Sequence, residues 1–148
     1  MRFFRKACAP LLVVFLVVSF SAAQQSSAQD ANVKAATKAA QDWLAVVDAG
    51  DYGKSWDEAS SFFQKRVTKQ QWEQMVSQVR TPVGKLQSRQ FKSAAETVPP
   101  GAPPGKYVTL QFNTKFATVG DAVETLFLML DNGKWKVAGY FVKPPSQK

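Results

Sequence analysis

The apolar residues between Ala122 and Val142 form two runs separated by a turn signal. The runs read AVETLFLML and WKVAGYFV, and Asn132-Gly133 lies between them. This pair tolerates positive φ at both central positions of a type I′ turn, so the stretch predicts a β-hairpin. A two-residue turn also predicts the register: Leu130 faces Trp135, Leu128 faces Val137, Leu126 faces Gly139 and Glu124 faces Phe141. One hairpin face is then apolar except for Glu124.

Two more strands are predicted before the hairpin. Residues Lys106 to Thr118 alternate between two faces, with the more apolar face made by Val108, Leu110, Phe112, Thr114 and Phe116. Lys85 to Val98 has a period of two but is more polar, which predicts a long, bent strand. The loop Pro99 to Gly105 joins these two strands.

The first half of the chain follows a helical period instead. We expect a helix from Ala31, capped by Asp30, with Ala36, Ala40, Trp43 and Val47 on one face and Gly50 as its terminator. A second, shorter helix is expected from Tyr52 to Phe63. Thr68 opens a third helix through a capping box with Gln71, and Thr81-Pro82 ends it. Helices followed by an antiparallel meander predict an α+β domain over residues 31–142, with the helices on one face of a curved sheet.

The first segment of the chain has the pattern of a secretory signal peptide. Arg2, Arg5 and Lys6 precede the apolar run Leu11 to Phe20, and small residues allow cleavage after Ala23 or Ala28. The apolar run is short for a transmembrane anchor, so we expect cleavage and an exported protein, periplasmic or secreted, with an uncleaved anchor as the alternative. Residues 24–30 are expected to be a disordered lead-in, and 143–148 a loose tail.

Composition limits the chemistry of the exported protein. The sequence has no histidine, and its one cysteine, Cys8, would be removed with the signal peptide. A disulfide framework, a thiol nucleophile and a histidine-centred triad are thereby excluded, as are metal sites built on imidazole or thiolate. No cofactor is expected. Removal of residues 1–23 lowers the net charge from +8 to +5, which favours anionic envelope components over nucleic acid as neighbours.

Several spaced motifs resemble a bacterial secreted family catalogued as domain of unknown function 4019. The matching residues run from Asp48-Ala49-Gly50-Asp51-Tyr52 to the hairpin, and include Ser55-Trp56, Trp72, Arg80-Thr81-Pro82-Val83-Gly84, Arg89, Pro103 to Tyr107, Glu124-Thr125 and Trp135 to Phe141. The resemblance covers about residues 31–142 and implies no particular activity. The element order is similar to the nuclear-transport-factor-two-like (cystatin-like) superfold, a cone in which a bent sheet wraps a long helix. Members of that superfold include enzymes and binding modules, so the fold does not decide the function.

Glu124 is the strongest candidate for a catalytic or binding role, because a carboxylate on an apolar face must be paired or functional. In one interpretation it is a general base or ligand anchor at the mouth of the cone. In the other, which we favour, it forms a salt bridge with Arg80 or Arg89 and locks helix to sheet. The two arginines have the same alternatives, since each is able to grip an anionic ligand. Tyr107 and Tyr140 complete the ligand-binding candidates.

Other patterns have a structural interpretation beside the functional one. Asp48, Asp51 and Asp57 do not match a calcium loop, and Asp51 is better explained as a helix cap. The four tryptophans are expected in the core instead of a sugar or peptide platform. A basic run between Lys65 and Lys92 favours a solvated face over a surface for anionic polymers.

The outer hairpin face suggests a partner. Val123, Phe127, Tyr140 and Val142 would make it too apolar for open water, so we expect homodimerisation through this face. The sequence thus favours a non-catalytic small-ligand-binding or assembly module of the bacterial envelope. The alternatives are a hydrolase or isomerase using Glu124 with an arginine or tyrosine, and a basic surface that binds anionic envelope polymers.

Overall fold

The computed structural model describes residues 21–144, which form four helices and one antiparallel sheet. The helices are α1 (Ser21–Asp48), α2 (Tyr52–Asp57), α3 (Ser61–Arg66) and α4 (Lys69–Val83). The strands are β1 (Leu86–Ala95), β2 (Tyr107–Phe116), β3 (Gly120–Asp131) and β4 (Lys134–Lys143), in the sheet order β1-β2-β3-β4. This arrangement confirms the predicted α+β class, with an open four-stranded sheet. The predicted signal peptide (1–23), apart from its last three residues, lies outside the described residues, as does most of the tail.

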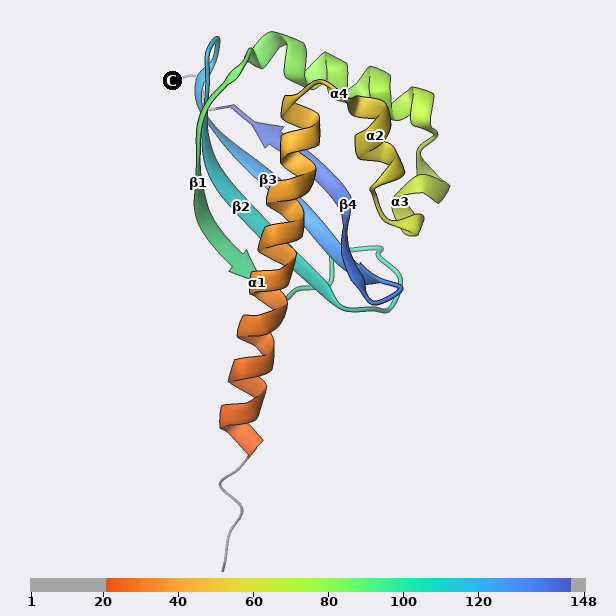
Figure 1. Ribbon diagram of the computed structural model, residues 1–148, viewed down its shortest axis with the longest axis vertical. Helices are drawn as coiled ribbons and strands as arrows, with labels where there is room; N and C mark the ends of the chain where they lie inside the picture. The colour runs from red at the N-terminus through yellow and green to blue at the C-terminus, as the bar shows by residue number, and fades with distance from the viewer. Residues whose placement is uncertain (1–20, 145–148) are drawn as a thin grey trace, which may run out of the picture.

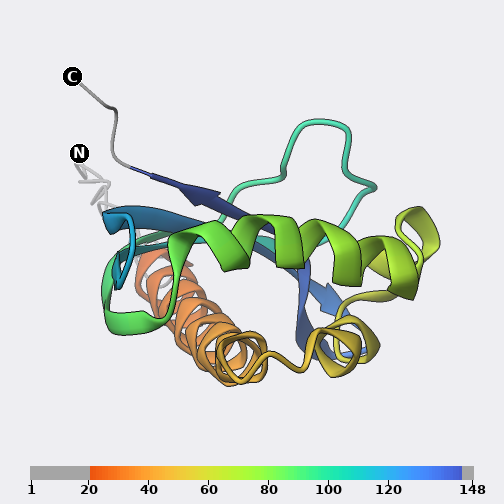
Figure 2. The ribbon, with the colours of Figure 1, turned by 90° about the horizontal axis from the view of Figure 1, so that it is seen from above.

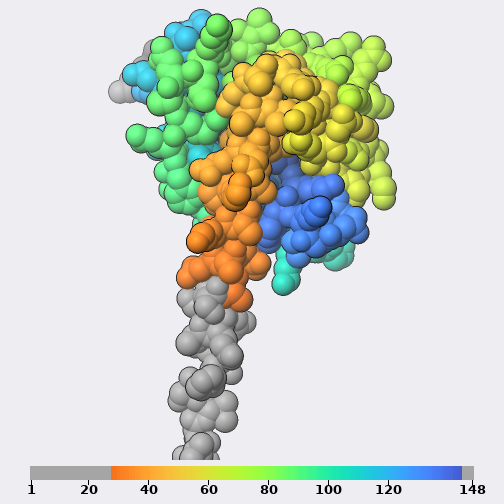
Figure 3. Space-filling view, in the orientation of Figure 1, coloured from red at the N-terminus to blue at the C-terminus, as the bar shows by residue number. Residues whose placement is uncertain are grey.

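All four helices lie on one side of the sheet, which is called the inner face below (Figure 1). The C-terminal half of α1 lies against the strands, and its N-terminal part extends beyond the sheet. Figure 3 shows α1 beside the segment of α2 and α3, with α4 across the upper end of the molecule. The Pro/Gly loop between β1 and β2 projects on the opposite, outer side (Figure 2).

The core forms where the predicted apolar faces of α1 and the sheet meet. The fully buried side chains include Leu44 and Val47 from α1, and Leu110, Leu126 and Leu128 from the strands. The alanines of α1 at positions 36 and 40 are also fully buried, so small side chains allow the helix to approach the sheet closely. The alternating burial along β2 confirms its predicted inner face, which ends at Phe116.

Two of the four tryptophans are in this core, and Trp56 and Trp135 are partly buried against it. Trp43 and Trp72 are buried, with ring centroids 5.9 Å apart, and Tyr140 packs edge-on against both. Their indole N–H groups donate to Ser55: Trp43 to its carbonyl at 2.7 Å and Trp72 to its hydroxyl at 2.9 Å. The α2 segment is therefore fixed between α1 and α4.

The helix ends differ from the predictions at three places. Helix α1 begins at Ser21, so Asp30 lies within the helix and the expected lead-in is helical from residue 24 onward. The predicted second helix is two helices, because Ser60 has an extended conformation and caps α3 by accepting from the N–H of Phe63. Helix α4 has the predicted capping box, but it continues past Pro82 to Val83 before Gly84 ends it at φ 83°.

The hairpin confirms the predicted turn but corrects the register beyond it. Asn132 and Gly133 both have positive φ, at 50° and 76°. The pairs Leu130–Trp135 and Leu128–Val137 are as predicted, but Phe127 pairs with Gly139, so Ala138 is an extra residue in a β-bulge. Leu126 therefore faces Tyr140 instead of Gly139, and Glu124 faces Val142 instead of Phe141.

The bulge exchanges the two faces of β4 beyond Ala138. Tyr140 and Val142, predicted on the outer face, contact the two clusters of the core, whereas Phe141 is 61% exposed. The predicted dimer face thus loses two of its four members. Its remaining residues, Val123 and Phe127, share the outer face with Phe141, and the rings of Phe127 and Phe141 are 5.8 Å apart.

Candidate functional site

The structure brings four of the five predicted site residues together on the inner face. Arg80 comes from the last turn of α4, Arg89 from the middle of β1, Glu124 from β3 and Tyr140 from β4. Tyr107 is not part of this group. It is buried at the far end of β2, where its hydroxyl donates to the carbonyl of Pro103 at 2.9 Å and so anchors the Pro/Gly loop.

Glu124 is completely buried, and five donated hydrogen bonds surround its carboxylate. Oε2 accepts from Arg89 Nε at 2.6 Å and from the Thr114 hydroxyl at 2.5 Å. Oε1 accepts from Tyr140 at 2.5 Å, from Arg89 Nη2 at 3.2 Å and from Arg80 Nη1 at 3.3 Å. Since a carboxylate offers about four lone-pair directions, Glu124 is fully occupied.

Asp48, the last residue of α1, joins the same group. Its Oδ1 accepts from Arg80 Nη2 at 2.7 Å and from Arg89 Nη2 at 3.1 Å, and its Oδ2 accepts from Arg89 Nη1 at 2.7 Å. Arg89 thus forms a two-pronged contact with each carboxylate, which only a planar guanidinium is able to make. The two arginines and two carboxylates together are neutral. They are called the ionic network below, with Thr114 and Tyr140 as its neutral members.

The network also interacts with the partial negative charges at the C-terminal ends of α1 and α4. A carboxylate at the C-terminus of α1 is unfavourable because that end carries partial negative charge, and Arg80 and Arg89 offset it. Arg80 itself lies in the last turn of α4, where the helix dipole favours a cation, and its guanidinium lies 4.7 Å from the Phe116 ring centroid. Every buried side-chain polar atom in the described part of the chain has a hydrogen-bond partner.

The surroundings keep the arginines charged and the tyrosine neutral. Burial alone lowers the pKa of Arg89, but its hydrogen bonds and attraction to Asp48 and Glu124 outweigh burial and raise that pKa. The pKa of Arg80 is raised in the same way, against burial, by Tyr140, Asp48 and Glu124. Burial and the nearby charge of Glu124 raise the pKa of Tyr140 well above its ordinary value of 10.0.

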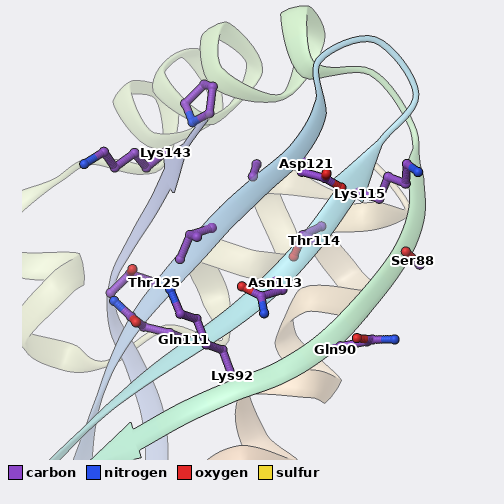
Figure 4. A pocket seen from close by; sticks show the side chains of 13 residues that line it. Ser88, Gln90, Lys92, Gln111, Asn113, Thr114, Lys115, Asp121, Thr125 and Lys143 are labelled. Carbon is purple, nitrogen blue, oxygen red and sulfur yellow. The ribbon is translucent and has the colours of Figure 1, made fainter. Parts of the chain in front are cut away.

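A polar hollow of about 740 Å³ lies on the outer face of the sheet, directly behind this network. Its side chains come from all four strands, with most from β1, β2 and β3 (Figure 4). Because strand residues alternate between faces, each network residue that lies on a strand has outward-facing neighbours in the chain. Gln90 follows Arg89, Asn113 precedes Thr114 and Thr125 follows Glu124, and all three line the hollow.

Two members of the network were not among the predicted site residues. The sequence groups Asp48 only with Asp51 and Asp57, as a weak alternative for a metal site, and in the structure the three have different partners. Asp51 caps α2 at Lys54, and Asp57 contacts Lys69 at 2.7 Å. The described residues contain no group of acidic side chains arranged to hold a metal ion. Thr114 was placed on the correct face, and its polar character among Phe112 and Phe116 was the only signal that pointed to it.

The fold and this network define an α+β protein in which buried charges join the helical layer to the sheet. Comparison with protein families assigns the chain more closely. It belongs to the family described as Protein of unknown function (DUF4019), whose model matches residues 39–140. That range contains every residue of the network. None of the curated proteins compared with the chain matches it.

Proposed function

We propose that the protein is a non-catalytic binding module of the bacterial envelope that holds its ligand or partner on the outer face of the sheet. The observation that supports this proposal is the full occupation of Glu124 by five donors, on a carboxylate that is itself completely buried. A general base must reach the proton that it removes. Glu124 would have to break the ionic network to do so, and this argues against the alternative of a hydrolase or isomerase.

The network suits a scaffold better than a reaction centre. It ties α1, α4 and the strands β1 to β4 to each other through one cluster of charge-assisted hydrogen bonds. The outer surface of these strands is the floor of the polar hollow. A rigid floor preserves the positions of binding groups and reduces the entropy lost when a ligand is bound.

An NMR titration tests this function. The isotope-labelled protein is titrated with size-fractionated envelope extract, and the ligand is afterwards recovered and weighed by mass spectrometry. We expect shifts of the outer-face amides, including those of Asn113 and Thr125, and an unchanged ligand. A ligand that is chemically altered by the wild type but not by Glu124→Gln would instead support an enzyme.

Export is the second part of the proposal, and it is supported by the signal-peptide pattern of residues 1–23. Among the described residues, no helix is both long and apolar enough to cross a membrane. Cell fractionation of the full chain, followed by intact-mass measurement, tests export. We expect a product in the periplasm or medium that begins at Gln24 or Gln29. A cytoplasmic product that retains Met1 would contradict it.

Assembly with a second copy is a further candidate, favoured by the exposed ring of Phe141 beside Phe127. These rings lie next to a smaller hollow of about 270 Å³, which Phe62, Arg66 and the Pro/Gly loop also line. Light scattering at micromolar concentration tests this candidate. A dimer that Phe141→Ser converts to a monomer would support it, and a monomeric wild type would remove it.

A further inference from the structure

The hollow on the outer face has an uneven distribution of charge. Three lysines line it, Lys92 from β1, Lys115 from β2 and Lys143 from β4, against one carboxylate, Asp121. Within the part of the chain that the structure describes, none of the three lysines lies in a salt bridge. The hollow therefore offers free positive charge to an anion.

Asp121 distinguishes the hollow from a general anion site. It pairs with Lys115 in the strand register, but the two side chains form no salt bridge. A carboxylate repels a phosphate chain or a nucleic acid that lies along the hollow. The same carboxylate is a good acceptor for hydroxyl groups, which are absent from polyphosphate and sparse on nucleic acids.

Amide and hydroxyl groups occupy the space between the charges. Ser88, Gln90, Gln111, Asn113 and Thr125 line the floor, and Figure 4 shows Lys92, Gln111 and Thr125 close together at one end. Amides both donate and accept hydrogen bonds, so they suit a ligand that is rich in hydroxyls. Among the residues lining the hollow, none is aromatic. An acyl chain or an apolar peptide would lie against charged and amide side chains along much of the hollow.

We infer that this hollow binds a segment of an acidic polysaccharide, with sugar carboxylates at Lys92 and Lys143 and sugar hydroxyls at Asp121 and the amides. This inference rests on the proposed binding function and adds the chemical class of the ligand. The volume of about 740 Å³ lies within the range of roughly 300–1,000 Å³ that is usual for ligand sites. The contacts are solvent-exposed lysines, so binding weakens as salt concentration rises.

Calorimetry with a short oligogalacturonate tests the inference, and the fully methyl-esterified oligomer is the control ligand without charge. Lys92→Gln/Lys143→Gln removes two charges from the hollow. Lys34→Gln/Lys134→Gln removes two charges from exposed positions elsewhere and gives the same net charge. We expect about a ten-fold loss of affinity in the first variant and less than about a two-fold loss in the second. Equal losses in the two variants would overturn the inference.

Asp121→Asn separates a sugar site from a site for any polyanion. If Asp121 accepts sugar hydroxyls, the variant weakens oligogalacturonate binding and strengthens the binding of polyphosphate. Stronger binding of both probes would overturn the inference. If oligogalacturonate fails to bind while envelope extract still shifts the outer-face amides, the ligand class is wrong and the proposed function stands. If neither binds, both are wrong.

Discussion

Glu124 and Arg80 are buried in a cluster of charges that is neutral as a whole. Glu124 alone would be costly to bury, but it shares Arg80 and Arg89 with Asp48, and Thr114 and Tyr140 supply neutral donors. The loss of hydration offsets much of the attraction in such a cluster, so its net contribution to stability is small. Removal of a single member is different, because it leaves the others unpaired.

Glu124→Gln tests this difference, because it replaces one carboxylate oxygen with an amide NH2 group and leaves the size of the side chain almost unchanged. The variant leaves two buried arginines opposite one carboxylate, and we expect the free energy of unfolding to fall by about 3 kcal/mol. Urea denaturation with far-UV circular dichroism measures the change. Glu58→Gln is the matched control. It removes an exposed pair with Lys54 at 3.8 Å and should change stability by no more than about 0.5 kcal/mol. Similar losses in the two variants would contradict a structural role for the network.

Tyr140 predicts a specific pH dependence. Its pKa is raised in the folded protein, so the folded state holds the phenol proton more tightly than the unfolded state does. The stabilisation from this proton is fully present below the ordinary pKa of 10.0 and is lost as the pH rises above it. Tyr140→Phe should be less stable at neutral pH, where the hydroxyl contacts are missing. Its stability should then fall less steeply than that of the wild type above pH 10. Parallel alkaline slopes, measured by urea denaturation, would disprove this role of Tyr140.

Helix α4 begins with a complete capping box, which satisfies backbone N–H groups that have no partner within the helix. The hydroxyl of Thr68 accepts from the N–H of Gln71 at 3.2 Å, and the Gln71 amide oxygen accepts from the N–H of Thr68 at 3.0 Å. We expect Thr68→Ala to lower the free energy of unfolding by about 1 kcal/mol. Thr81→Ala in the last turn of the same helix is the control. Thermal unfolding of both variants measures the change in stability. An equal loss in Thr81→Ala would mean that the loss in Thr68→Ala does not come from the cap.

Elements with a local signal were predictable, and those set by distant contacts were not. The turn at Asn132-Gly133, the alternation along β2 and the cap at Thr68 follow from a few adjacent residues. The bulge at Ala138 does not, since Gly139 marks an irregular point in the strand but not which residue is extra. Gly139 gives one physical reason for it: a Cβ there would lie 3.1 Å from the Phe127 ring, so the strands approach closely at that point. One extra residue then decides whether Tyr140 faces the network or the solvent.

The candidate site was predictable to a similar extent. The pairing of Glu124 with the two arginines follows from the cost of a carboxylate on an apolar face. The participation of Asp48 does not, because α1 and β3 meet only in the folded chain. Its position one residue after Val47, on the buried face, was the available clue. The outer hollow is likewise lined by residues of four strands that meet only in the folded sheet, and its polar residues are ordinary in the sequence.

At the scale of the whole molecule, the network attaches the least buried strand to the rest. None of the side chains of β1 is fully buried, and only Leu86, Arg89 and Ala94 are partly buried. One edge of β1 pairs with β2, and on the outer face Ser88, Gln90 and Lys92 line the hollow. Arg89 is therefore the main charged contact of this strand on the inner face. Its chain neighbours Ser88 and Gln90 line the hollow on the outer face, so Arg89 also holds this part of the floor in place.

Arg89→Lys should loosen β1 more than the other strands. Lysine keeps the positive charge, but it is unable to make paired contacts with Asp48 and Glu124 at the same time. We expect faster amide hydrogen exchange across β1 and its pairing residues on β2, with much less change in the β3–β4 hairpin, where Leu126, Leu128 and Val137 are buried. Arg66→Lys, which alters an exposed arginine that lies over Phe62, is the matched control and should leave β1 unchanged.

A uniform increase of exchange over all four strands would mean that the network stabilises the whole fold without a special attachment of β1. If β1 alone responds, oligogalacturonate affinity of Arg89→Lys should fall as well, although the substituted side chain lies on the opposite face of the sheet from the ligand.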